Sequence, residues 1–101
     1  MARALVDTGA VVALINRDDR YHRAAVDWFQ RFRGELLTTE AVITETAYVL
    51  AASPAHQHAA LVWFDRAVKA ELLRVEPVAD YAALERIIAQ YASLPCDYAD
   101  A

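Results

Sequence analysis

Four carboxylates carry the strongest chemical signal in this sequence of 101 residues. Asp7 directly follows a short apolar run, Glu45 lies in a stretch that is otherwise apolar apart from threonines, and Asp97 and Asp100 stand three residues apart. Like charges from separate parts of the chain repel one another unless a cation lies between them, and hard divalent cations take oxygen ligands. The pattern therefore indicates a site for such a cation.

Each of these acids also has a simpler interpretation. Asp is a favoured N-cap, and the apolar segment after Asp7 has the pattern of a short helix. Glu45 suits an exposed helix surface. Asp97 and Asp100 fall on one face of a helical turn and complement the positive end of a helix that begins there. The residue types alone leave both interpretations open.

Other residues with reactive side chains give weaker signals. His56 and His58 are two apart, which directs their rings to different sides of a helix, so a zinc site is not favoured. Cys96 is the single cysteine, so an intramolecular disulfide is excluded and a small buried side chain is expected. Trp28 and Trp63 fall on apolar helical stripes, which favours core or interface packing over base stacking.

The elements that must position the acids alternate along the chain. Short apolar runs predict three strands, and longer periodic segments predict the helices between them. The strands are expected at 4–6, 36–38 and 72–75, and the helices at 9–16, about 21–32, about 39–52, from Pro54 onward and after Asp80. Gly34 is expected to end the second helix. Strands separated by helices predict an α/β fold with a parallel sheet covered on both faces.

Composition limits the class of protein. The chain is 57% hydrophobic and 24% charged, with a net charge of −4, which predicts one globular domain over residues 1–101. The net charge argues against a protein that coats nucleic acid, although residues 1–33 hold six Arg and four Asp. No secretion signal and no apolar stretch of membrane length are present, so no membrane association and a cytoplasmic location are expected.

Three segments together resemble the motifs of PIN-domain ribonucleases of the VapC toxin type. They read LVDTGAVVAL at residues 5–14, LTTEAVITETAYVL at 37–50 and YASLPCDYADA at 91–101. They occur in the family's order and span nearly the whole chain. The resemblance implies a three-layer α/β/α fold and a metal-dependent endoribonuclease toxin that a cognate antitoxin keeps inactive.

The resemblance also implies which residues act. Asp7, Glu45 and Asp100 would hold Mg²⁺, or alternatively Mn²⁺, with Asp97 beside them, and Glu45 is preferred to Glu40 within the second motif. Carboxylate-bound Mg²⁺ can activate water and relieve charge on a phosphodiester, so no protein nucleophile is required. Exposed arginines after the first helix, Arg17 and Arg20, are candidates for contacts with RNA phosphates.

Two other readings stay open at this point. One is a non-catalytic PIN-like module that binds a partner protein, and the other is a plain α/β domain whose acids only cap helices. Metal binding and nuclease activity would separate the three.

Two structural expectations complete the sequence analysis. Helices that carry Trp28, Phe32, Trp63 and Phe64 predict surplus apolar surface and hence a homodimer or an antitoxin groove. The first strand is apolar on both faces, which predicts neighbours on both edges, and family members continue through a further helix and strands with a fourth acid. The chain is therefore expected to be incomplete at its C-terminus, or to have that strand edge covered by another chain.

Overall fold

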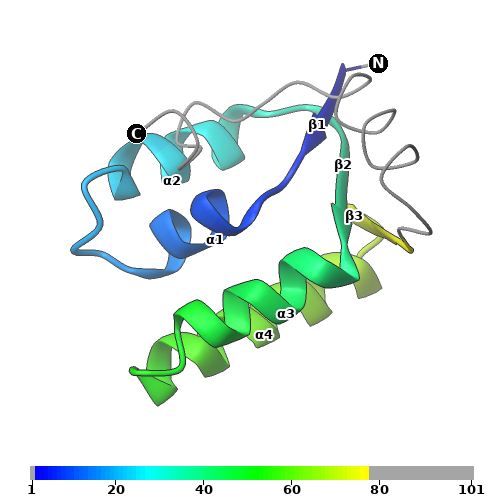
Figure 1. The fold of residues 1–101 in the computed structure, drawn as a ribbon. Coiled ribbons are helices and arrows are strands. Elements are labelled where there is room, and N and C mark those ends of the chain that lie inside the picture. Colours follow the sequence, from blue (N-terminus) through cyan, green and yellow to red (C-terminus); the bar gives the residue numbers. More distant parts are fainter. Residues whose placement is uncertain (1, 78–101) are drawn as a thin grey trace.

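The computed structural model describes residues 2–77, in which three strands alternate with four helices (Figure 1). Each element predicted for this part of the chain is present, with ends shifted by a few residues. The helix predicted after Asp80 lies outside the described residues. In chain order the elements are β1 (Ala2–Leu5), α1 (Thr8–Ile15), α2 (His22–Arg31), β2 (Gly34–Thr39), α3 (Glu40–Val49), α4 (Pro54–Lys69) and β3 (Leu73–Glu76).

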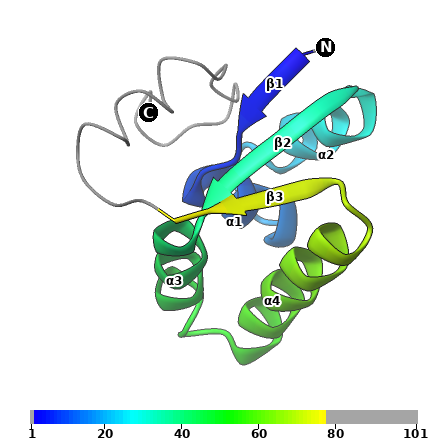
Figure 2. The same ribbon diagram turned by 90° about the vertical axis from the view of Figure 1, so that its right-hand side faces the viewer.

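The three strands form one parallel sheet in the order β1-β2-β3, as Figure 2 shows. Ala4 pairs with Leu36, and Leu36 pairs with Leu73, so these three side chains share one face of the sheet. The predicted parallel sheet is confirmed. Among the described strands β1 pairs with β2 alone, so the second neighbour expected for β1 remains a prediction.

The described core lies between this face of the sheet and the helices. Helix α1 is central, because it packs against α2, α3 and α4, and its residues from Thr8 to Ala13 are all buried. On one side Ala4 and Ala25 pack with α1, and on the other Phe64 and Leu73 pack with it. A helix this apolar is stable only when other elements surround it, which fixes α1 beneath the sheet.

Most aromatic side chains on α2 and α4 pack against the core or against one another instead of facing solvent. Phe64 is only 4% exposed, Trp28 stacks on Phe32 with ring centroids 4.6 Å apart, and Trp63 meets Phe29 edge to face. Packing on the core is therefore confirmed for the tryptophans. Phe64 does not belong to the surplus apolar surface that these helices predict, because its side of α4 faces the core. Within residues 2–77 the exposed large apolar side chains are Tyr48, Val49, Leu61, Val68 and Leu72.

Gly34 has a different role from the one predicted. Helix α2 ends at Arg31, and Gly34 is the first residue of β2 with φ +150°. A Cβ at this position would collide with the carbonyl oxygen of Ala2. Glycine is therefore required for the close approach of β1 and β2, and for a φ that side chains disfavour.

Thr38 connects the ends of the first two strands. Its side chain is fully buried, and its Oγ1 donates a hydrogen bond of 2.9 Å to the carbonyl oxygen of Val6. Val6 lies just beyond β1, where the chain turns into α1, and its N–H donates to the carbonyl of Leu37 at 2.7 Å. The Thr38 hydroxyl thus supplies a partner for a buried carbonyl where regular strand pairing ends.

Replacing Thr38 by Val should lower the free energy of unfolding by about 1–3 kcal/mol, because the Val6 carbonyl would lose its side-chain donor. Urea unfolding followed by circular dichroism measures this change. Thr38→Ser keeps the hydroxyl and is the matched control, with a smaller loss expected. Equal stability of the Val variant and the wild type would contradict this role.

Candidate active site

Two helices begin side by side at one edge of the sheet. Val6, which donates its N–H to the carbonyl of Leu37, is followed by Asp7, and Thr39 is the last residue of β2, so Asp7 and Thr39 lie at neighbouring strand ends. Asp7 Oδ1 accepts a hydrogen bond from the N–H of Ala10 at 2.9 Å and caps α1. Thr39 Oγ1 accepts from the N–H of Val42 at 3.2 Å and caps α3.

This arrangement gives the edge a positive electrostatic character. The N–H groups in the first turn of a helix carry a partial positive charge that favours carboxylates and phosphates. The first turns of α1 and α3 both lie at the carboxyl ends of their strands, where sites form in open parallel sheets. Glu40, in the first turn of α3, suits this environment as a helix-terminal carboxylate.

The N-cap interpretation of Asp7 is confirmed. Its side chain is half-buried, and the hydrogen bond to Ala10 fixes the orientation of the carboxylate. A carboxylate has two oxygens with several acceptor positions, so capping does not conflict with cation binding. The cap instead holds the charge at the edge of the sheet.

Glu45 lies in the second turn of α3, with an exposed side chain. At 3.6 residues per turn, Glu40 and Glu45 are separated by about 140° around the helix, so they do not share a face. Helix α3 packs against α1, so the structure brings together the helices that carry Asp7 and Glu45.

The other two predicted acids lie outside the described residues. The expected convergence of Asp7, Glu45 and Asp100, with Asp97 beside them, therefore remains a prediction. Within residues 2–77, no three side chains of the metal-ligating types gather in one place.

Thr8 was missed by the sequence analysis. Its side chain is 7% exposed, and its Oγ1 has no hydrogen-bond partner within the described part of the chain. Leaving a buried hydroxyl unpaired costs about 1–3 kcal/mol, and such groups are tolerated where a ligand or water supplies the partner. The sequence signal that could have identified Thr8 is its position directly after Asp7, just beyond the end of the first strand.

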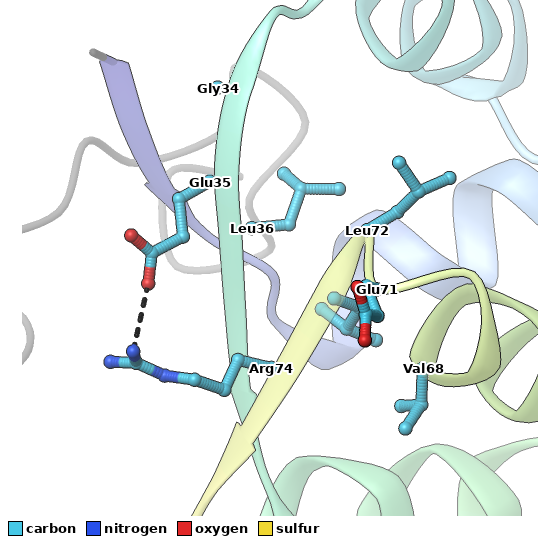
Figure 3. A pocket seen from close by; sticks show the side chains of 8 residues that line it. Gly34, Glu35, Leu36, Val68, Glu71, Leu72 and Arg74 are labelled. Atoms are coloured by element: carbon cyan, nitrogen blue, oxygen red, sulfur yellow. Dashed lines mark ion pairs between the residues drawn. The ribbon is translucent and has the colours of Figure 1, made fainter.

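A separate cavity lies at the opposite ends of the strands. Figure 3 shows it between the start of β2, the start of β3 and the end of α4, with a volume of about 490 Å³. Glu35 and Arg74 form an ion pair of 3.3 Å beside it. Because Gly34 and Leu73 begin their strands, this cavity is not at the edge that carries Asp7.

The remaining candidates lie away from the strand ends. Arg17 and Arg20 are exposed in the connection between α1 and α2, and the Arg20 guanidinium lies 5.0 Å from the centre of the Tyr21 ring. His56 and His58 lie in α4, where the first is half-buried and the second exposed.

The comparison with protein families assigns the fold. The PIN domain model matches residues 4–101, which is nearly the whole chain. The chain belongs to the PIN-domain family. Its parallel sheet and helices are those of the PIN-like α/β/α fold, so the predicted fold class is confirmed.

A solved structure places the chain near the toxin branch of the PIN family. The crystal structure of VapC20 from Mycobacterium tuberculosis, described as a toxin that cleaves the sarcin-ricin loop, matches with a TM-score of 0.62 and 26% identity. The match covers 90% of this chain and 73% of VapC20. A comparison with curated proteins found no match. None of the helices in residues 2–77 is long and apolar enough to cross a membrane.

Thr8→Val should raise the free energy of unfolding by about 1 kcal/mol, because it removes a buried hydroxyl that lacks a partner. Denaturant unfolding without divalent cations measures this effect. The expected change in the free energy of unfolding is opposite in sign to that of Thr38→Val, so each variant serves as a control for the other. A loss of stability in the Thr8 variant would show that its hydroxyl is satisfied in the folded protein.

Proposed function

We propose that this PIN-domain protein is a metal-dependent endoribonuclease toxin that acts in the cytoplasm and is neutralised by a cognate antitoxin protein. The observation that carries the proposal is the pair of helix N-termini at the sheet edge, with the carboxylate of Asp7 fixed between strand and helix. Such an edge binds both a cation, through the carboxylates, and a phosphate, through the helix termini. The family match and the likeness to VapC20 support the same function.

Asp7, Glu45 and Asp100 would hold Mg²⁺, with Mn²⁺ as an alternative, and Asp97 would stand beside them. Carboxylate oxygens are the ligands these hard cations prefer. The unpaired hydroxyl of Thr8 fits the same site, since it offers a polar group directly beside Asp7. It suits a hydrogen bond to a water or a phosphate oxygen at the strand end.

The chemistry needs little more from the protein than positioning. When bound, the divalent cation relieves negative charge on the phosphate and provides an acidified water for hydrolysis. Asp7 keeps its orientation through the Ala10 N–H, so the carboxylate does not have to reorganise when RNA binds. The first turns of α1 and α3 attract the phosphodiester by their partial positive charge.

Asp7→Asn and Glu45→Gln should each lower the rate of RNA cleavage by about a hundredfold or more, because each removes a negative charge from the cation site. Cleavage of a labelled RNA in Mg²⁺ measures the rate. Glu40→Gln is the matched control, since Glu40 lies on a different face of α3, and it should retain activity. Full activity of the Asp7 variant would overturn the proposed function.

Asp7→Asn should also abolish binding of Mn²⁺, measured by calorimetry, with little loss of stability. Asn caps a helix about as well as Asp, so the hydrogen bond to Ala10 is kept while the charge is lost. Asp7→Ala removes both and should cost about 1 kcal/mol of stability. Unchanged affinity for Mn²⁺ in the Asn variant would exclude Asp7 as a metal ligand and leave helix capping as its role.

We also propose that the protein forms a homodimer through the outer side of α4. Leu61 and Val68 are exposed and stand seven residues apart, on one stripe of the helix. Leu72, in the connection that follows α4, is 64% exposed. Exposed apolar side chains that line up in this way are typical of contact surfaces between proteins.

A Leu61→Arg, Val68→Arg double variant should be monomeric by light scattering at concentrations where the wild type is dimeric. The charges would be buried without partners at the interface. Ala59→Arg, on a different side of α4, is the matched control and should remain dimeric. A wild-type chain that is monomeric at micromolar concentration would remove the dimer from the proposal.

A further inference from the structure

Tyr48 is the most exposed large apolar side chain in the described part of the protein. It lies near the end of α3, and 82% of its surface is accessible. The other aromatic residues described each pack on a second ring, on the core or under a guanidinium, namely Tyr21, Trp28, Phe29, Phe32, Trp63 and Phe64. The ring of Tyr48 has no such partner among residues 2–77.

Tyr48 lies on the same side of α3 as the candidate site residue Glu45. The two residues are three apart on α3, so their Cβ atoms lie about 5–6 Å from each other on the same side of the helix. Side chains on a helix lean toward its N-terminus. The N-terminus of α3 is the end that follows β2 (Figure 1), at the edge of the sheet that carries Asp7. Tyr48 is therefore expected to extend along α3 toward the turn that carries Glu45.

We propose that Tyr48 is a stacking platform for an unpaired nucleobase of the RNA, next to the phosphate that is cleaved. The inference rests on the proposed function, because it requires RNA at Asp7 and Glu45. The base must be unpaired, because a base inside a regular duplex is already stacked on its neighbours and cannot reach the ring. Stacking on one aromatic ring accepts every base, so Tyr48 contributes affinity and position rather than sequence specificity.

The surroundings of Tyr48 fit a base better than a protein surface. Around the helix axis, Glu45 lies between Tyr48 and Val49, which is 46% exposed. On the turns before Tyr48, the exposed residues on the same side are Thr44 and Ala41. A partner protein that packed on both Tyr48 and Val49 would bury the Glu45 carboxylate, which is unfavourable without a counter-charge. A base that stacks on the ring leaves Glu45 accessible to water and to a cation.

Three variants of the full chain separate stacking from simple apolar contact. Tyr48→Phe keeps the aromatic ring, Tyr48→Leu keeps an apolar side chain without a ring face, and Tyr48→Ala removes both. Their affinity for a short fluorescein-labelled single-stranded RNA is measured by anisotropy, with Ca²⁺ in place of Mg²⁺ and with intact RNA verified on a gel. We expect Tyr48→Phe to bind like the wild type, and Tyr48→Leu and Tyr48→Ala to bind about tenfold to a hundredfold more weakly.

A spectroscopic readout locates the base itself. A 2-aminopurine placed next to the cleavage site should lose fluorescence when it stacks on the wild type or Tyr48→Phe, and keep it with Tyr48→Leu. Because Tyr48 is exposed, all three variants should have the same midpoint of urea unfolding as the wild type.

The outcomes distinguish this inference from the function on which it rests. If Asp7→Asn cleaves RNA like the wild type, the proposed function fails. If Asp7→Asn is inactive while Tyr48→Leu binds RNA as well as the wild type, only the stacking role of Tyr48 is overturned. A Tyr48→Leu chain that binds RNA normally but changes oligomeric state in light scattering would assign the residue to a protein interface instead.

Discussion

The hydrogen bond from Thr38 to the carbonyl of Val6 is the contact on which the candidate site depends. The pairing of β1 with β2 ends at this point, because the chain after Val6 leaves the sheet to begin α1. Without the Thr38 hydroxyl, a buried carbonyl would lack this donor where the two strands part. With it, Asp7 and Thr39 lie at strand ends held in register, and both helices begin at the same edge. The bond thus fixes the relative position of the two capping residues.

Thr8 and Thr38, both buried near this edge, differ in whether their hydroxyl groups are hydrogen-bonded. Thr38 is satisfied and stabilises the fold, whereas the buried hydroxyl of Thr8 has no partner in the described part of the chain. An unpaired polar group is a cost that a folded protein retains where the group serves another purpose. In this protein the unpaired group stands beside the carboxylate proposed to bind the cation.

Helix α3 combines three roles on different sides. Ile43 and Leu50 pack on the core, Thr39 and Glu40 complete its N-terminus at the sheet edge, and Glu45 and Tyr48 lie exposed on the outside. A periodic pattern in the sequence reveals only the first role, since the core-facing side chains repeat with the helical period. The exposed side carries the carboxylate and the aromatic ring that the proposals assign to cation and base.

The sequence by itself determined the order of strands and helices along the chain, the parallel sheet and the motifs of the PIN family, because hydrophobic periodicity and N-caps such as Asp7 are local properties. It also pointed to Asp7, since a charge directly after an apolar strand is costly without a partner. Only the tertiary structure decided that Gly34 serves the approach of β1 to β2, and that among residues 2–77 the Thr38 hydroxyl has a hydrogen-bond partner whereas the Thr8 hydroxyl has none. These properties depend on which backbone or side chain lies opposite each residue, and residues distant in sequence supply those neighbours.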